Sequence, residues 1–275
     1  MSDMSYKILG LYDAKLNEWD KLAYLHINSG GGACVNGSSS EITLRNAGEP
    51  IGEECYSIVV PPNFKPPLGG YIALNKGECL LRLGDDGKLS VVVSGFACVS
   101  SKLEAWRPIN AAVLTVSDKG SRGERADTAG PALADMAESL GVRAAHRDIV
   151  PDERGVIADK LKTWADSGEV NLILTTGGTG LSRRDVTPEA IMDIHDRTVP
   201  GFGEIMRAHS MRYTPRGFLT RSLAVTRKDV LIIAFPGSER AVRQCFEAIA
   251  PGLRHAVEIL CGRDAECGGH GGGRR

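Results

Sequence analysis

The stretch "LILTTGGTGLSRRDVTPEA", residues 172–190, decides the fold of the second half of the chain. It begins with apolar and β-branched residues, a run that is typical of a buried strand. Three glycines at positions 177, 178 and 180 follow, and then come two arginines, an aspartate and the pair Thr187-Pro188. Because proline fits the first turn of a helix, this pair predicts a helix start. The stretch therefore predicts a strand, a tight turn that carries charged side chains, and a helix.

The same alternation extends in both directions from this stretch. Strand-like runs occupy residues 111–117, 144–150, 170–176 and 228–235, and segments typical of helices lie between and after them. Alternation of this kind predicts a parallel sheet with helices on both faces. Asp127 or Thr128 is expected to cap the first of these helices, and Asp152 the second. We therefore predict an α/β domain over residues 105–264 with a mostly parallel sheet.

Residues 1–104 show a different pattern. Short strand-like runs such as "CYSIVV", "GYIAL" and "KLSVVVSGFACV" are separated by turn-rich segments such as "NGSSS" and "GDDGK". The pair Asp86-Gly87 between two alternating runs predicts a β-hairpin. We expect residues 1–104 to form a small β-rich domain of unknown role. The glycine-rich residues 265–275 predict a disordered tail.

The bulk composition excludes some classes of function. The 275 residues include 33 Lys and Arg against 34 Asp and Glu, which gives a formal net charge of −1. Nucleic-acid binding relies on a basic excess that displaces counterions, and none is present. The sequence contains no run of about 18 apolar residues, so it predicts no membrane span. The first residues show no signal-peptide pattern. The seven cysteines are widely spaced and form no CxxC pair, so we expect reduced thiols in a cytoplasmic protein.

The loops that follow the predicted strands are the candidate site. Ligands of open parallel sheets bind beyond the carboxyl ends of the strands, so "SDKGSRGERADT", "PDER", "GGTGLSRRDVTP" and "PGSER" should meet at one edge. Glycine N–H groups can cradle phosphate, although a tight turn is their commoner use. Asp152 and Asp185 fall in two of these loops, and Mg²⁺ is held by one or two carboxylates together with phosphates and waters. Each aspartate also has a structural alternative, a helix cap for Asp152 and a surface ion pair with Arg183 or Arg184 for Asp185.

Six segments within residues 111–262 follow one another without large gaps: "TVSDKGSRGERADTAGP", "IVPDE", "LILTTGGTGLSRRDVTPEA", "PGFGEIMR", "LTRSLA" and "FPGSERAV". Together they resemble the MogA/MoaB family of molybdenum-cofactor biosynthesis proteins, to which the G domains of plant Cnx1 and of gephyrin belong. The resemblance implies a MogA-like fold and a molybdopterin adenylyltransferase. Such enzymes transfer AMP from ATP to the terminal phosphate of molybdopterin with Mg²⁺ and release pyrophosphate. It also implies a homotrimer and a downstream metal-insertion protein as a partner.

The resemblance further implies which residues form the site. Asp152 and Asp185 match the two functionally important aspartates of the family and are the expected catalytic and Mg²⁺-binding residues. Contacts to the pterin or the nucleotide are expected from Ser117, Gly177, Gly178, Thr179, Gly180, Arg184, Thr220, Gly237 and Ser238. The guanidinium of Arg184 suits phosphate oxygens. Thr220 stands where relatives often carry serine, and Ala234 replaces an asparagine found in several relatives, which leaves substrate detail open.

Three alternatives stay open at this point. The site could hold molybdopterin without turnover, as in a scaffold protein, or it could serve a tungsten cofactor instead of a molybdenum cofactor. The β-rich residues 1–104 are compatible with a MOSC module, a sulfur carrier that is fused to some bacterial relatives. A domain that docks a partner or decorates the trimer is the other interpretation of these residues.

Overall fold

The computed structural model of the chain describes residues 6–7, 10–13, 18–20, 25–28, 32–35, 38–40, 42–47, 49, 56–97 and 102–263. The predicted tail at 265–275 lies outside the described residues. The chain divides into two compact units, Met1–Pro108 and Ile109–Arg275. The predicted domain boundary after residue 104 falls near this division.

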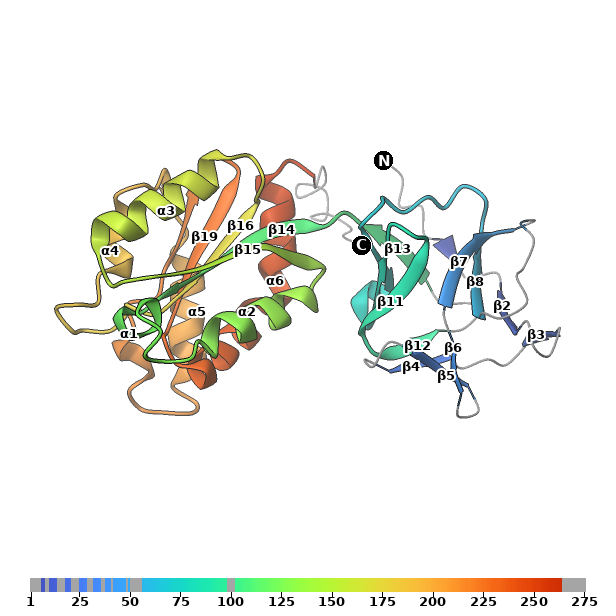
Figure 1. Cartoon of the computed structure of the whole chain (residues 1–275), viewed down its shortest axis with the longest axis horizontal. Helices are drawn as coiled ribbons and strands as arrows, with labels where there is room; N and C mark the ends of the chain where they lie inside the picture. The colour runs from blue at the N-terminus through green and yellow to red at the C-terminus, as the bar shows by residue number, and fades with distance from the viewer. Residues whose placement is uncertain are drawn as a thin grey trace, which may run out of the picture. The chain divides into compact units, whose positions relative to one another are not determined.

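The first unit contains two sheets (Figure 1). A nine-stranded sheet has the order β1-β13-β9-β10-β11-β7-β8-β2-β3, and a four-stranded sheet has the order β12-β4-β5-β6. Apart from the parallel pair β7–β8, the strand pairs that the structure describes are antiparallel. The strands are β1 (Tyr6–Lys7), β2 (Gly10–Asp13), β3 (Glu18–Asp20), β4 (Leu25–Asn28), β5 (Gly32–Val35), β6 (Ser38–Ser40), β7 (Ile42–Asn46), β8 (Tyr56–Val60), β9 (Tyr71–Leu74), β10 (Cys79–Leu83), β11 (Lys88–Val93), β12 (Gly95–Ala97) and β13 (Lys102–Trp106), with one 3-10 turn, η1 (Asn75–Gly77).

The predicted hairpin at Asp86-Gly87 is confirmed. Strands β10 and β11 pair in antiparallel register on either side of it. Gly87 has a φ of +78°, the left-handed region that glycine adopts at little cost. The side chain of Asp86 stabilises the turn by accepting a hydrogen bond of 3.0 Å from the Lys88 N–H.

The second unit contains a six-stranded sheet in the order β15-β14-β16-β19-β18-β17. Its strands are β14 (Ile109–Val116), β15 (Val142–Val150), β16 (Leu172–Thr176), β17 (Arg197–Thr198), β18 (Ala224–Arg227) and β19 (Val230–Phe235). The first four strands in that order are parallel, which confirms the predicted α/β fold with a mostly parallel sheet. Strands β18 and β17 extend the sheet in antiparallel direction. The strand-like runs in the sequence did not predict this edge, because both strands are short.

Helices cover both faces of this sheet (Figure 1). The cluster of buried side chains on one face includes residues of α2, α5 and α6, and the cluster on the other face includes residues of α3 and α4. The helices are α1 (Asp118–Ser121), α2 (Ala129–Glu138), α3 (Arg154–Asp166), α4 (Thr187–Met192), α5 (Pro200–Ser210) and α6 (Glu239–Leu260), with a 3-10 turn, η2 (Gly217–Leu219). Within the described residues, no helix is both long enough and apolar enough to cross a membrane.

The helix caps differ from the prediction at one position that matters for the site. Thr128 occupies the N-cap position of α2 without a capping bond from its side chain, and the Oδ1 of the preceding Asp127 accepts a hydrogen bond of 2.9 Å from the Gly130 N–H. The predicted cap of α3 by Asp152 is wrong. Glu153 occupies the N-cap position of α3 and makes no capping bond through its side chain. The carboxylate of Asp152 instead accepts a hydrogen bond of 2.9 Å from the Asp118 N–H, which belongs to the loop after β14.

Candidate active site at the carboxyl edge of the sheet

Four loops meet at the carboxyl ends of β14, β15, β16 and β19, where the sequence placed the candidate site. They enclose a cavity of about 390 Å³, the central cavity. Seven of the predicted site residues line it: Ser117, Asp152, Gly177, Gly178, Asp185, Gly237 and Ser238. Thr115 and Asp127, which the sequence did not indicate as site residues, line it as well.

The turn after β16 has a backbone that requires glycine. Gly177 has a φ of +99°, and a Cβ there would lie 2.1 Å from the carbonyl oxygen of Val116. Gly178 has a φ of +63°, and a Cβ there would lie 2.3 Å from Thr187 Oγ1 and 3.1 Å from Asp152 Oδ1. The two glycines therefore allow β14 and the loop of Asp152 to approach the turn closely.

The carbonyl groups of this turn are held by the protein, whereas several N–H groups are left to a ligand or to water. Thr187 Oγ1 donates to the Gly177 oxygen at 2.9 Å, and the Thr187 N–H donates to the Gly178 oxygen at 3.1 Å. Among the described residues, no acceptor is found for the N–H groups of Gly178, Thr179 and Gly180. Successive unpaired N–H groups of this kind bind anions.

The N-terminus of α6 adds to the anion-binding character of the central cavity. Gly237 and Ser238 line the cavity directly before this 22-residue helix. The positive end of a helix dipole favours a phosphate or a carboxylate there. Ser238 caps α6, since its Oγ accepts a hydrogen bond of 3.3 Å from the Ala241 N–H. Ser117 caps α1 in the same way, by accepting a bond of 3.0 Å from the Gly120 N–H.

Asp152 lies among other negative charges. Its own N–H donates to Asp118 Oδ1 at 3.1 Å, so the loops after β14 and β15 are joined by a reciprocal pair of hydrogen bonds. Burial raises the pKa of the Asp152 carboxyl above its ordinary value, and the charges of Asp118 and Asp185 act in the same direction, against the hydrogen bond from the Asp118 N–H. A cation in the central cavity would relieve this repulsion.

Asp185 is oriented by the turn that carries it. Its Oδ2 accepts a hydrogen bond of 2.8 Å from the Ser182 N–H, and its own N–H donates to the Ser182 oxygen at 3.0 Å. The same Oδ2 lies 2.8 Å from the position that a Cβ on Gly180 would occupy. The absence of a side chain at Gly180 therefore leaves space for the carboxylate.

The alternative in which Asp185 forms an ion pair with Arg183 or Arg184 is wrong. The guanidinium of Arg184 pairs with Asp118, with Nη2 at 2.7 Å from Oδ1, and lowers the pKa of the Asp118 carboxyl. Arg184 lines none of the cavities at this edge of the sheet. The predicted phosphate ligand is thus paired with a carboxylate beside the site.

A second cavity, of about 410 Å³, adjoins the central cavity. The two share Gly178, Asp185 and Gly237. The remaining predicted contact residues, Thr179, Gly180 and Thr220, line the second cavity. Thr220 Oγ1 lies 3.3 Å from Thr179 Oγ1 and 2.8 Å from Ser222 Oγ, so its hydroxyl belongs to a short polar chain.

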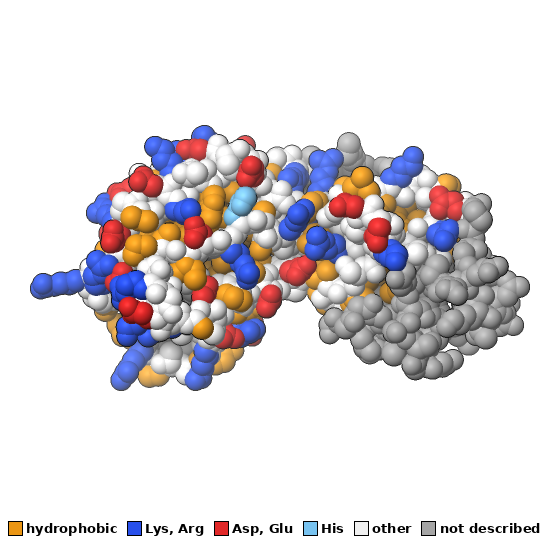
Figure 2. Space-filling model, in the orientation of Figure 1, with side chains coloured by type: hydrophobic (Ala, Val, Ile, Leu, Met, Phe, Trp, Pro, Cys, Tyr) orange, Lys and Arg blue, Asp and Glu red, His pale blue; other side chains and the backbone are white. Residues whose placement is uncertain are grey.

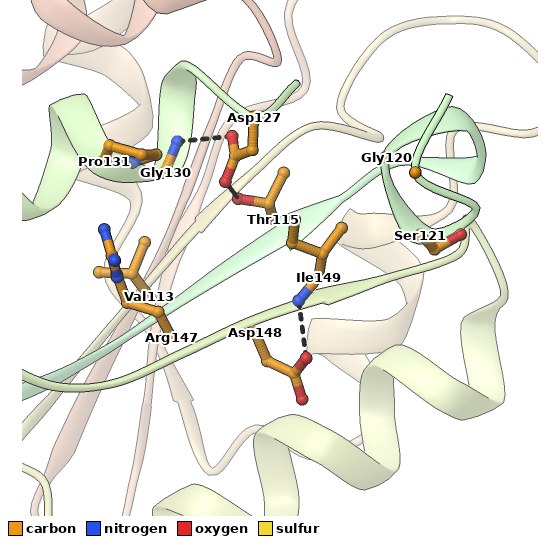
Figure 3. A pocket seen from close by; sticks show the side chains of 11 residues that line it. Val113, Thr115, Gly120, Ser121, Asp127, Gly130, Pro131, Arg147, Asp148 and Ile149 are labelled. Atoms are coloured by element: carbon orange, nitrogen blue, oxygen red, sulfur yellow. Dashed lines mark hydrogen bonds between the residues drawn. The ribbon is translucent and has the colours of Figure 1, made fainter. Parts of the chain in front are cut away.

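A third cavity, of about 610 Å³, shares Thr115, Gly120 and Asp127 with the central cavity (Figure 3). Figure 3 shows Asp127 between Thr115 and Gly130, with Oδ2 accepting a hydrogen bond of 2.7 Å from the Thr115 hydroxyl. Arg147 on β15 also lines this cavity. No sequence pattern pointed to Arg147, and Asp127 could be interpreted only as a helix cap.

The carboxylates of the central cavity suit a metal ion that is bound jointly by the protein and the substrate, rather than one bound by protein ligands alone. Within the described residues, no group of three or more His, Cys, Asp or Glu side chains could hold a metal ion. Asp152 and Asp185 line the same cavity, and two such carboxylates could hold Mg²⁺, which keeps waters and takes its other ligands from substrate phosphates. Charges of both signs are interspersed over the visible face of this unit (Figure 2), so that face has no patch of a single sign to attract an anionic ligand.

These features define an α/β protein with a polar cavity at the carboxyl edge of its sheet. Known proteins are similar to it in sequence and fold. Residues 112–255 match the family model described as "Probable molybdopterin binding domain". A molybdopterin adenylyltransferase of Helicobacter pylori strain J99 is 38% identical over 156 residues, which cover 56% of this chain and 89% of that protein.

Two solved structures have the same fold. The molybdopterin biosynthesis enzyme MoaB of Thermus thermophilus is 44% identical with a TM-score of 0.54, covering 56% of this chain and 97% of its own. The tungsten cofactor synthesizing protein MoaB of Pyrococcus furiosus is 33% identical with a TM-score of 0.52, covering 57% of this chain and 99% of its own. The chain belongs to the MogA/MoaB family of molybdenum-cofactor biosynthesis proteins.

Proposed function

We propose that the chain is a molybdopterin adenylyltransferase, which transfers AMP from ATP to molybdopterin and releases pyrophosphate. The observation that carries the proposal is the central cavity, which is lined by the carboxylates of Asp152 and Asp185 together with Gly178, whose N–H is unpaired among the described residues. The relatives that bear the name of this activity support it. In this function the protein contributes chiefly by positioning the reacting phosphates and neutralising their charge.

The unpaired N–H groups of the glycine turn and the N-terminus of α6 would bind phosphate oxygens. Asp152 and Asp185 would hold Mg²⁺, whose positive charge would offset the negative charge of the phosphates. The attacking group is the terminal phosphate of molybdopterin, which is already an anion at neutral pH. No general base is required, which agrees with the absence of histidine from the residues that line the three cavities.

The flanking cavities support a reaction between two substrates. The second and third cavities each share lining residues with the central cavity, and Asp185 is among those shared with the second. An enzyme that joins two molecules must hold both with their reacting groups close together. The body of one substrate in each flanking cavity would bring the two phosphates together beside Asp152 and Asp185.

The test is the release of pyrophosphate by the full chain with ATP, Mg²⁺ and molybdopterin. We expect one pyrophosphate for each adenylyl-molybdopterin formed, and none when molybdopterin is left out. Tight binding of molybdopterin without any pyrophosphate would contradict the proposal and favour the scaffold protein. The same step would serve a tungsten cofactor, and metal insertion assays with molybdate and tungstate would separate the two.

We further propose a cytoplasmic homotrimer that passes its product to a metal-insertion protein, on the basis of the family resemblance. Size-exclusion chromatography with light scattering should give three times the mass of the chain. A monomer at micromolar concentration would contradict the trimer.

The role of residues 1–104 is a separate proposal, and docking of a partner is the interpretation that we retain. A sulfur carrier needs a reactive thiolate. Cys79 does not fit, because it is 1% exposed and burial raises the pKa of its thiol to about 11. Cys34, Cys55 and Cys98 have side chains outside the described residues. One fast-alkylating thiol among these three would favour the sulfur carrier.

A further inference from the structure

Arg221 connects two segments of the candidate active site. It lies between η2 and β18, directly after Thr220, and its own N–H donates to the Thr179 oxygen at 2.8 Å. Its Nε donates to the Gly180 carbonyl oxygen at 2.8 Å, and its Nη2 donates to the Asp185 carbonyl oxygen. Nη1 pairs with the carboxylate of Glu189 on α4.

Apart from the Arg184–Asp118 ion pair and the turn bonds between Ser182 and Asp185, the loop that Arg221 contacts has little packing to fix its position. Residues 181–184 are exposed, and Leu181 in particular is 69% exposed. A segment with few buried apolar contacts opens at low free-energy cost. Hydrogen bonds to its carbonyl groups therefore take the place of packing.

We propose that Arg221 is a positioning residue for adenylyl transfer. By holding the carbonyl groups of Gly180 and Asp185, its guanidinium fixes both ends of the exposed loop. The Asp185 carboxylate thereby keeps its place at the central cavity, and Thr179 and Gly180 keep theirs at the adjoining second cavity. Arg221 lines none of the three cavities, so it acts through the loop and not on the substrate. The inference rests on the proposed function.

The geometry requires arginine. A planar guanidinium carries five N–H donors and can serve acceptors in three directions, whereas an ammonium group is a single point of charge. Glu189 keeps the guanidinium in place. Burial would raise the pKa of the Glu189 carboxyl, but the hydrogen bonds from Arg221 and from the backbone leave it below its ordinary value.

The second unit contains a matched control. Arg227 at the end of β18 also joins three acceptors, because Nε and Nη2 contact Asp166 at 3.2 and 2.7 Å and Nη1 donates to the Ile194 oxygen at 2.9 Å. Neither Arg227 nor these partners line the three cavities. Loss of the contacts of Arg227 should therefore destabilise the fold without disturbing the site.

The experiment compares Arg221→Lys and Arg227→Lys in the full chain. For Arg221→Lys we expect kcat for pyrophosphate release to fall about 10²-fold, the size of effect that a misplaced reacting group produces, with a much smaller change in the KM for ATP. The Mg²⁺ concentration for half-maximal rate should rise. Hydrogen exchange should become faster in a peptide that covers residues 177–187. For Arg227→Lys we expect a lower Tm with unchanged kcat, Mg²⁺ dependence and exchange in that peptide.

Wild-type kcat and Mg²⁺ dependence in Arg221→Lys would overturn the inference. Equal losses of kcat in both variants would do the same, because the effect would then be general destabilisation. An inactive wild-type protein would contradict the adenylyltransferase proposal instead. In that case the exchange comparison decides whether Arg221 positions the loop.

Discussion

Single residues determine how the carboxylates of the site are presented. Asp152 and Asp185 come from different loops, and each has a backbone N–H that fixes one carboxylate oxygen. Gly178 and Gly180 leave the space in which these carboxylates lie, because a Cβ at either position would come within about 3 Å of a carboxylate oxygen. Charge and space at these positions can be altered separately by substitution.

Replacement of Asp185 by asparagine tests the charge. An asparagine oxygen can still accept the hydrogen bond from the Ser182 N–H, so we expect the turn and the Tm to be retained. Loss of the negative charge should lower kcat for pyrophosphate release by about 10²-fold or more. Steady-state kinetics over a range of Mg²⁺ concentrations measures this. Unchanged turnover would remove Asp185 from the mechanism.

Replacement of Gly180 by alanine tests the space. The backbone of Gly180 does not have a positive φ, so alanine introduces no strain of that kind. Its Cβ would lie 2.8 Å from Asp185 Oδ2 and must displace the carboxylate. We expect kcat to fall roughly 10-fold or more with little change in Tm. Gly155→Ala on α3 is the control, since a Cβ there meets nothing within 4 Å, and it should keep wild-type kcat.

At the scale of elements, the ends of helices and strands are joined by ion pairs far from the site. Asp166, the last residue of α3, contacts Arg227 at 2.7 Å and Lys228 at 2.7 Å, and thereby joins this helix to the turn between β18 and β19. The hydrogen bonds from Arg227 and then from Lys228 lower the pKa of the Asp166 carboxyl to about 2.

The depressed pKa of Asp166 predicts a pH-dependent contribution to stability. A lowered carboxyl pKa stabilises the fold at any pH above the unfolded value near 4, and this stabilisation is lost as the pH falls through the folded value of about 2. Asp166→Asn should therefore lower Tm at pH 7, and the difference from wild type should shrink between pH 4 and pH 2. Asp159→Asn on the same helix is the control and should leave Tm unchanged. A constant difference at every pH would contradict the interpretation.

At the scale of the whole molecule, the chain divides into two compact units, and the candidate site lies in one of them. A ligand should therefore stabilise the two units unequally. A ligand stabilises only the unit that binds it, by RT ln(1 + [L]/Kd). The loops of all three cavities belong to the unit Ile109–Arg275.

We expect calorimetry of the full chain to show two unfolding transitions. Mg²⁺ with ATP should raise the midpoint temperature of only one of them. At a nucleotide concentration about 100 times Kd, the stabilisation should be about 2.7 kcal/mol. The rise in this midpoint temperature should be smaller in the variant Asp185→Asn. Equal shifts of both transition temperatures would contradict the expectation that only the unit Ile109–Arg275 is stabilised.

The sequence by itself determined the parallel α/β fold, the hairpin at Asp86-Gly87 and the loops that meet at one edge of the sheet. These features follow from local patterns, because the alternation of strands and helices fixes the direction of each strand and hence which strand ends lie together. The family resemblance added the identity of the aspartates.

Only the tertiary structure decided which partner each charged side chain takes. Asp152 is not the predicted helix cap but accepts a hydrogen bond from Asp118, which is 34 residues away in the sequence. Arg184 pairs with Asp118 across 66 residues. The hydrogen bonds that Arg221 donates to the Gly180 and Asp185 carbonyl groups, and the antiparallel pairing of β17 with β18, also join segments that are distant in the sequence. Such pairings depend on distances between segments that are remote in the chain, and residue spacing along the chain carries no information about those distances.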